Sequence, residues 1–439
     1  MVLLQNFKNV FFVPELRKKL FFTLAILAVY RLGAHIPIPG INTAALSGLL
    51  SSGFTGGIIS YLDLFSGGAL KNFAIFALGM IPYINASIMM QLLTVMVPSL
   101  EQLSKEGEYG RKIIGQYTRY LTFALSIIQG FGIAFLIEAQ SHLGLALNPG
   151  WGFRLTTVLI LSVGALFVMW LGEQINAHGI GNGSSMIIFA GIVVGLPGAI
   201  LKIVNHVKMG QMDPLLVGLL ILITLFVVSC IVFLEKGERR VTIQYAKRVV
   251  GHRVYGGQSS YIPLKINPAG VIPVIFASAI IQLPMMLTNM LATKFAALNF
   301  LADWFAYNGV IFYASQAGLI IFFSYFYTAV IFNPVELAEN IRKSGGSVPG
   351  IRPGKKTAEF FDYLLTRIGL PGAIYLASLA VIPTILQNIF SFPVMFSGIS
   401  LLIVIGVAMD TSSQIESHLI ERRYEGFLST GRLKNRLGR

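Results

Sequence analysis

The sequence contains ten long apolar runs, each close to the length of a membrane-spanning helix. Such a helix needs about 20 predominantly apolar residues to cross the hydrocarbon core of a bilayer. The runs lie at residues 20–34, 70–98, 113–138, 154–171, 184–203, 214–234, 268–291, 309–332, 368–388 and 396–414. Only 12% of the residues are charged, whereas a soluble globular domain carries about 25%. We therefore predict an all-α, polytopic membrane protein with ten transmembrane helices.

Lysine and arginine are distributed unevenly over the segments that join these runs. Cytoplasmic loops of membrane proteins retain an excess of both residues. If the N-terminus lies inside, the inside segments hold 26 of the 33 basic residues and the outside segments hold six. We therefore expect a multi-pass protein with both termini in the cytoplasm.

Two of the predicted cytoplasmic segments, residues 235–267 and 333–367, are much longer than helix connections usually are. They carry seven and six of the basic residues, and both contain glycine and proline turn residues that are typical of ordered, hairpin-like tips. We interpret them as a docking surface for a partner. The alternative is that they only satisfy the orientation rule and bind anionic lipid.

Residues 57–67, between the first and second runs, are apolar but too short to cross a bilayer. A short apolar segment bracketed by glycines is typical of a re-entrant element that enters the membrane from one side. Irregular backbone at membrane depth persists only where protein or a water-filled cavity covers it, so this element predicts a cavity. An amphipathic helix lying on the outer surface is the alternative.

Proline interrupts several of the predicted spans. An internal proline removes a backbone donor and kinks its helix, and kinked spans surround the cavities of transporters and channels. We expect kinks at Pro82, Pro197, Pro273, Pro284, Pro371 and Pro383.

The sequence shows no signature of a catalytic or cofactor site. The six histidines include no pair at metal-ligand spacing, and the single cysteine, Cys230, excludes a cysteine cluster. In residues 349–357, Pro349 stands where a phosphate-binding loop requires Gly, and Lys356 stands where it requires Ser or Thr. We expect neither an enzyme nor a bound cofactor or metal ion. The candidate acids Glu138, Glu173 and Asp410 lie at span ends, which disfavours an ion-coupled transporter.

Motifs spread in order along almost the whole chain resemble one family, the SecY/Sec61-alpha protein-conducting channels, and its bacterial branch in particular. These motifs are IPIPG at 36–40, MIPYINASI at 80–88 with Gln91, GE at 107–108, GR at 110–111, GEQI at 172–175, GIGNG at 179–183, YAKR at 245–248 and VPGIRPG at 348–354. The residues alone leave open a second class, a secondary transporter of a small solute built on an inverted repeat. The resemblance favours the channel.

The resemblance implies two pseudo-symmetric five-helix halves, residues 1–205 and 206–439, around a central pore that also opens sideways into lipid. Residues 57–67 would form the plug, a re-entrant helix that closes the pore at rest. Its candidate residues are Ile58, Ile59, Tyr61, Leu62, Asp63, Leu64 and Phe65.

The family's pore ring, transferred through the matched motifs, falls on Met80, Ile84, Ser184, Ile188, Ile275 and Ile403. Met80 and Ile84 are four residues apart and share one helix face, as do Ser184 and Ile188. An apolar constriction of this kind can exclude ions by dewetting. Ordinary helix packing is the alternative for any one of these residues, and Ser184 departs from the family's usual apolar residue.

The same resemblance places a lateral gate between the second and seventh spans, with candidate residues Asn85, Ser87, Gln91, Gln282 and Leu283. The basic loops would dock a partner through Arg239, Arg240, Lys247, Arg248, His252, Arg253 and Arg352. The implied partners are the SecE and SecG subunits, the SecA ATPase, the ribosome through its RNA, anionic lipid, and secretory and membrane-protein precursors. The expected function is translocation of unfolded polypeptides across the bacterial plasma membrane, with release of apolar segments into the bilayer.

Overall fold

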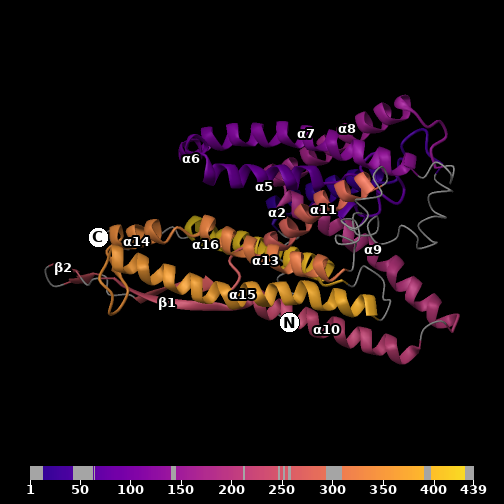
Figure 1. The fold of residues 1–439 in the computed structure, drawn as a ribbon. Helices are drawn as coiled ribbons and strands as arrows, with labels where there is room; N and C mark the ends of the chain where they lie inside the picture. Colours follow the sequence, from indigo (N-terminus) through magenta and orange to yellow (C-terminus); the bar gives the residue numbers. More distant parts are fainter. Residues whose placement is uncertain are drawn as a thin grey trace. The chain divides into compact units, whose positions relative to one another are not determined.

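The computed structural model describes residues 13–42, 63, 65–139, 145–210, 213–245, 248–250, 253–255, 259–292, 309–389 and 397–430. The described chain is mostly helical (Figure 1), which confirms the predicted fold class. It divides into two compact units, Met1–Gly195 with Val407–Arg439, and Leu196–Gly406. We call these the first and the second unit. The predicted halves, 1–205 and 206–439, stay a prediction.

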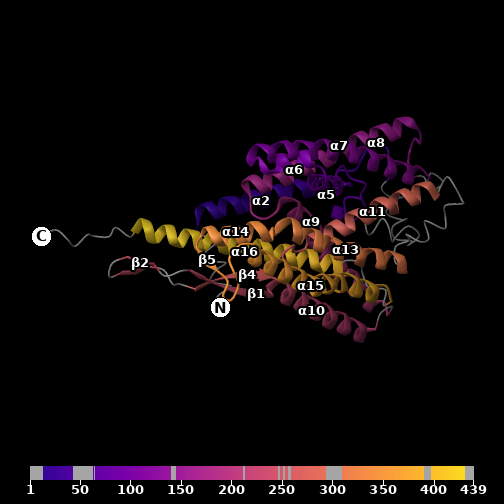
Figure 2. The same cartoon turned by 60° about the vertical axis from the view of Figure 1, so that its left-hand side comes forward.

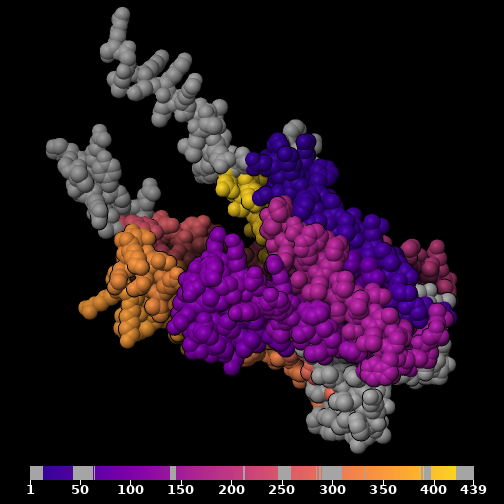
Figure 3. All heavy atoms as spheres, turned by 90° about the horizontal axis from the view of Figure 1, so that it is seen from above, coloured from indigo at the N-terminus to yellow at the C-terminus, as the bar shows by residue number. Residues whose placement is uncertain are grey.

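The first unit is built from helices alone among its described elements. These are α2 (Pro14–Gly33), α5 (Ile81–Met96), α6 (Pro98–Lys105), α7 (Glu108–Ala139) and α8 (Trp151–His178). The unit also contains α9 (Gly183–Lys208) up to residue 195 and α16 (Gly398–Thr430) from residue 407. The long helices α7 and α8 pack against each other. The later part of α16 lies beside α2 (Figure 3), where Ile415 and Leu419 pack around the buried Leu16.

The second unit contains helices and short strands. Its complete helices are α10 (Pro214–Lys236), α11 (Ile272–Ala292), α13 (Val310–Ile331), α14 (Pro334–Lys343) and α15 (Lys355–Ile389), and it also contains the end of α9 and the start of α16. Its strands are β1 (Glu238–Tyr245), β2 (Arg248–Val250), β3 (Arg253–Tyr255), β4 (Ser259–Lys265) and β5 (Gly346–Ser347). The strands β2 and β3 form the far end of the hairpin that β1 and β4 begin (Figure 2).

Each of the ten predicted runs overlaps a described helix, namely α2, α5, α7, α8, α9, α10, α11, α13, α15 and α16. Within the described residues, seven helices are long and apolar enough to cross a membrane, or up to eight if a bent pair counts as one span. That pair is α5 and α6, which meet at an angle of 100°. The ten-helix prediction is consistent with these helices.

Two of the six predicted proline kinks are wrong. Pro82 and Pro273 are the second residues of α5 and α11, so they begin helices instead of bending them. Proline suits the first helical turn, because the N–H that it lacks would have no partner there. The residues before Pro82, from 67 to 80, are mostly turns where an apolar span was expected. The other four prolines, Pro197 in α9, Pro284 in α11 and Pro371 and Pro383 in α15, lie inside helices.

The two predicted basic loops fold together, which the sequence did not indicate. Strand β1 pairs antiparallel with β4 in the first loop and also with β5 in the second, where Gln244 lies opposite Ser347. The result is a three-stranded sheet in the order β4-β1-β5. The hairpin-like character predicted for the first loop is confirmed, and the sheet is the exception to an otherwise all-α fold.

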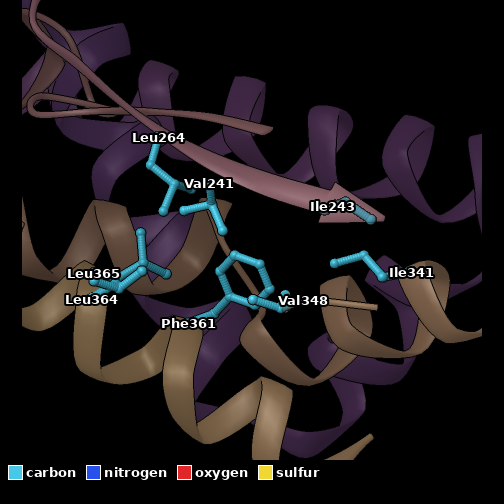
Figure 4. Packing of buried hydrophobic residues seen from close by; sticks show 8 residues of the cluster. All are labelled: Val241, Ile243, Leu264, Ile341, Val348, Phe361, Leu364 and Leu365. Atoms are coloured by element: carbon cyan, nitrogen blue, oxygen red, sulfur yellow. The ribbon is translucent and has the colours of Figure 1, made fainter. Parts of the chain in front are cut away.

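A small apolar core fixes this sheet to the helices beneath it. Along β1, Val241 and Ile243 are buried while the residues between them are exposed, as expected for a strand with one covered face. Phe361 of α15, which is fully buried, lies under these two side chains (Figure 4). The remaining members of the cluster are Leu264, Ile341, Val348, Leu364 and Leu365. We call this cluster the loop core.

The loop core predicts that Phe361→Ala unfolds the basic loops before the membrane helices. The substitution leaves a cavity under β1 and should cost about 3–5 kcal/mol. Tyr363→Ala on the same helix is the matched control, because the Tyr363 side chain is 56% exposed. Limited proteolysis of the purified chain should cut the loops much faster in Phe361→Ala only, and equal cleavage rates in the two variants would contradict the assignment of the core.

Candidate functional site

Three of the six pore-ring candidates lie buried in the first unit. Met80 directly precedes α5, Ile84 follows one turn later, and Ile188 belongs to α9; they are 1%, 4% and 0% exposed. A Cβ atom placed on Gly172 of α8 would come within 2.5 Å of the Met80 Cε atom. The Met80 side chain therefore packs closely over this glycine.

Ser184 differs from the other candidates because its side chain takes part in starting a helix. Its hydroxyl donates a hydrogen bond of 2.7 Å to Oδ1 of Asn182, which also accepts from the backbone N–H of Ser184 and Ser185. Asn182 is thus the N-cap of α9. Ser184 is only half-buried, so its hydroxyl belongs to the cap more than to an apolar constriction.

The other two candidates, Ile275 of α11 and Ile403 of α16, lie buried in the second unit at 5% and 0% exposure. Just before α11, Val271 approaches Gly406 of α16 so closely that a Cβ atom on this glycine would lie 1.8 Å from the valine Cγ2. The residue that precedes α11 therefore packs directly against α16 within this unit. Because the ring draws on both units, its closure stays a prediction.

Five plug candidates, Ile58, Ile59, Tyr61, Leu62 and Leu64, lie outside the described residues. The other two, Asp63 and Phe65, are buried at 1% and 2% exposure.

The Asp63 carboxylate binds three groups of its own segment. It forms an ion pair of 3.1 Å with Nζ of Lys71, and its Oδ1 accepts hydrogen bonds from the Lys71 backbone N–H and the Ser66 hydroxyl. The end of the plug segment is therefore held by an ion pair and hydrogen bonds within residues 63–71.

The backbone of the motif at residues 36–40 forms hydrogen bonds with residues 73–75, which follow the plug segment. Ile38 donates an N–H to the carbonyl of Phe73, and Ile75 donates to the carbonyl of Ile36, at 2.9 and 3.0 Å. Pro37 and Ala74 lie between them as an antiparallel bridge. This motif, one of those that carry the family resemblance, thus connects the end of α2 to the residues before α5 through backbone hydrogen bonds.

Two polar candidates of the lateral gate, Asn85 and Gln282, are buried without hydrogen-bond partners among the described residues. Asn85 of α5 and Gln282 of α11 are 1% and 3% exposed, and within the described residues neither the nitrogen nor the oxygen of either side-chain amide has a partner. A buried polar group in this state costs about 1–3 kcal/mol. Gln91 shares the feature through its Oε1, Ser87 is half-buried, and nothing is described for the Leu283 side chain.

One further amide of this kind was missed by sequence reasoning. Gln316 of α13 is fully buried, and neither amide atom has a partner among the described residues. It stands alone as a glutamine in the apolar run 309–332. A polar residue in the middle of a span was the available signal, because such residues are rare in membrane helices.

Two ion pairs join α7 to α8. Arg119 donates from Nε and Nη2 to the two carboxylate oxygens of Glu173, both at 2.9 Å. Near the opposite ends of these helices Arg154 pairs with Glu138, and its guanidinium lies 4.5 Å from the centre of the Phe135 ring. Two of the three span-end acids, Glu138 and Glu173, are thus bound to arginines, and no ion-coupling role is needed to explain these two.

The predicted docking residues fall into described and undescribed groups. Arg239, Arg240 and Arg352 are exposed, and Arg240 is bound within the sheet by Glu238 at 2.8 Å, which raises the pKa of the guanidinium. For Arg239 and Arg352 no acidic partner is found within the described residues. The backbones of Arg248 and Arg253 lie in β2 and β3, while Lys247 and His252 lie outside the described residues.

The described part of the chain contains no group of three or more His, Cys, Asp or Glu side chains that could hold a metal ion.

Comparisons with known proteins point to one family. The SecY family model matches residues 74–412. The protein translocase subunit SecY of Aquifex aeolicus is 46% identical over 425 residues, covering 96% of this chain and 98% of that protein. Its namesake from Escherichia coli strain K12 is 45% identical over 423 residues, covering 96% and 95%.

Solved structures show the same fold. A protein-conducting channel superimposes with a TM-score of 0.64 at 16% identity, over 92% of this chain and 93% of that one. Sec61 in a canine ribosome–channel complex gives 0.59 at 17% identity, over 92% and 93%. The first unit and the second unit are thus both covered by one known architecture, and these similarities give no support to the transporter alternative.

Because the buried amides are unpartnered, we predict that replacing Gln282 raises the stability of the protein and lowers its transport activity. Gln282→Leu removes two unsatisfied polar atoms and should stabilise the resting protein by about 1 kcal/mol, because no hydrogen bond is lost with them. If Gln282 belongs to a gate, transport activity should fall while the unfolding temperature rises. Gln316→Leu is the matched control and should raise the unfolding temperature with activity unchanged. A lower unfolding temperature in both variants would contradict this description of the amides.

Proposed function

The chain belongs to the SecY family, and from that premise we propose how its residues conduct a polypeptide. It is the channel-forming subunit of a bacterial protein translocase, a multi-pass protein of the plasma membrane. The observation that carries this function is the 46% identity to a translocase subunit over 96% of the chain. We infer that its termini are cytoplasmic, because the basic residues lie on that side in the predicted topology.

The apolar waist of the channel is proposed to consist of Met80, Ile84, Ser184, Ile188, Ile275 and Ile403. The five apolar members are buried in the resting protein. A narrow ring of such side chains excludes water and therefore ions, without a charged filter. A translocating polypeptide would push the ring apart, and residues 57–67 would support the closed ring as a plug. Ser184 is its weakest member because its hydroxyl caps α9.

Sorting of apolar segments follows from the solvation of the passing chain. A segment of about 20 apolar residues gains free energy on leaving the wet pore for lipid, whereas a polar segment would bury unsatisfied groups there. We place the exit at the helices α5 and α11, which carry Asn85 and Gln282. Their unpartnered amides support this placement, since an amide offers the donor and the acceptor that a passing backbone lacks in the membrane.

The sheet of the second unit is proposed as the docking surface. Arg239 and Arg352 are exposed without an acidic partner among the described residues, so their charge is available to another molecule. A basic surface suits ribosomal RNA and also acidic patches of a protein such as the SecA ATPase. The sequence has no nucleotide motif, so the driving force comes from such a partner. SecE and SecG complete the proposed complex, and anionic lipid would contact the basic loops.

The waist predicts that Ile188→Ser makes the resting channel leak. A hydroxyl at this fully buried position would wet the constriction and lower the barrier to ions. Halide flux into vesicles that contain the purified complex should rise well above wild type. Leu201→Ser, at a position of the same helix that is 63% exposed, is the control and should leave the flux unchanged. Equal flux in wild type and Ile188→Ser would contradict the waist.

The docking surface predicts that Arg352→Glu impairs transport without preventing insertion of the protein into the membrane. Like charges placed across an interface cost several kcal/mol, so export should fall roughly tenfold or more. The assay is protection of a secretory precursor from protease in vesicles with the complex, SecA and ATP. Lys202→Glu, an exposed cation predicted to lie on the opposite side of the membrane, is the control. Normal protection with Arg352→Glu would remove this residue from the docking role.

A further inference from the structure

A tight turn lies between the two segments of the first unit that carry pore-ring candidates. At residues 66–68 the chain turns through Gly67 and Gly68, whose φ angles are +64° and +89°. On one side, a Cβ atom on Gly67 would lie 2.5 Å from the Cα atom of Gly191 in α9. On the other, a Cβ atom on Gly79 would lie 3.3 Å from the Cα atom of Ser66. We call this segment the wedge turn.

Both neighbours of the wedge turn adjoin waist residues. Gly79 is bonded directly to Met80. Gly191 lies three residues after Ile188, on the same side of α9. Because both contacts are backbone to backbone, with no flexible side chain between them, a shift of the wedge turn changes the spacing of Met80 and Ile188.

Hydrogen bonds and one ion pair hold the wedge turn in place. The Tyr30 hydroxyl donates to the Ser66 carbonyl at 2.8 Å, and Arg31 donates to the carbonyl of Gly67. The Ser66 hydroxyl donates to Asp63, whose carboxylate pairs with the Lys71 ammonium at 3.1 Å. Residues 63 and 71 thus close a loop around the turn.

The two side chains of the ion pair differ strongly in their exposure to solvent. The Asp63 side chain is 1% exposed, while that of Lys71 is 40% exposed. The lysine can reach water without its partner, but the carboxylate cannot. Removing the lysine would leave a buried charge without its counterion, and removing both charges together would not.

We propose that Asp63 and Lys71 are positioning residues of the channel, whose ion pair holds the wedge turn between Gly79 and Gly191 and thereby sets the closed spacing of the waist. This inference rests on the proposed function of Met80 and Ile188 as waist residues. In this proposal, a salt bridge outside the ring maintains the spacing at which the ring excludes water.

The test is halide flux into vesicles that contain the full chain with the subunits that co-purify with it. Lys71→Met should raise the resting flux about tenfold, between the few-fold effect of an exposed pair and the far larger effect of a buried one. Lys71→Arg keeps the ion pair and should restore wild-type flux. The double variant Asp63→Asn with Lys71→Met should also stay near wild type, because asparagine still accepts the hydrogen bonds to Oδ1. Lys202→Met, at an exposed lysine, is the control.

One additional variant provides an independent test of the proposal. Gly191→Ala places a Cβ atom 2.9 Å from the Gly67 Cα, so it should displace the wedge turn and raise the flux even if Lys71→Met yields no folded protein. Wild-type flux in Lys71→Met and in Gly191→Ala, with a leak in Ile188→Ser, would overturn the positioning role and leave the proposed channel intact.

A second readout separates failure of the inference from failure of the waist. In a Cys230→Ser background, the thiol introduced by Ile188→Cys is labelled with a membrane-impermeant maleimide, with and without Lys71→Met. If Ile188→Ser causes no leak, the waist assignment fails. Faster labelling in Lys71→Met then still supports positioning of α9 by the ion pair, and an unchanged rate overturns it.

Discussion

Helices inside a bilayer gain little hydrophobic free energy by meeting one another, because lipid tails are as apolar as their side chains. Their association depends on close van der Waals approach, which glycine permits in both units of this protein. A Cβ atom on Gly183 would lie 1.9 Å from the carbonyl oxygen of Gly172, which brings the start of α9 onto α8. In the second unit a Cβ atom on Gly398 of α16 would lie 2.2 Å from the carbonyl oxygen of Leu379 in α15. The waist residues are placed by helices that meet in this way.

A protein-conducting channel has to combine a dry constriction with a path for polar backbone. The proposed waist residues Met80, Ile84 and Ile188 suit the first requirement, because they are apolar and at most 4% exposed. The proposed gate residues Asn85 and Gln282 bear on the second, because their buried amides have no hydrogen-bond partner among the described residues and offer a donor and an acceptor to a passing backbone.

The sequence was sufficient to predict the helices but not the contacts between distant segments. Apolar runs located ten of the described helices, because each run is close to the length that a membrane span requires. Pro82 was misjudged, because hydropathy cannot distinguish a span from apolar turns that precede a helix.

The pairing of Gln244 with Ser347 and of Arg119 with Glu173 joins residues far apart in the chain. No local pattern contains that information. The pore-ring residues came from the family resemblance and not from periodicity.

Site-specific photocrosslinking during transport tests the central claim most directly. A photoreactive side chain is introduced in turn at Met80, Ile84, Ile188, Ile275 and Ile403, and a secretory precursor is stalled halfway through the reconstituted complex. The account predicts that all five positions crosslink to the precursor, while Leu201, an exposed position of α9, crosslinks to lipid only. Precursor crosslinks at Leu201 with none at the five buried positions would show that the polypeptide does not pass the apolar waist.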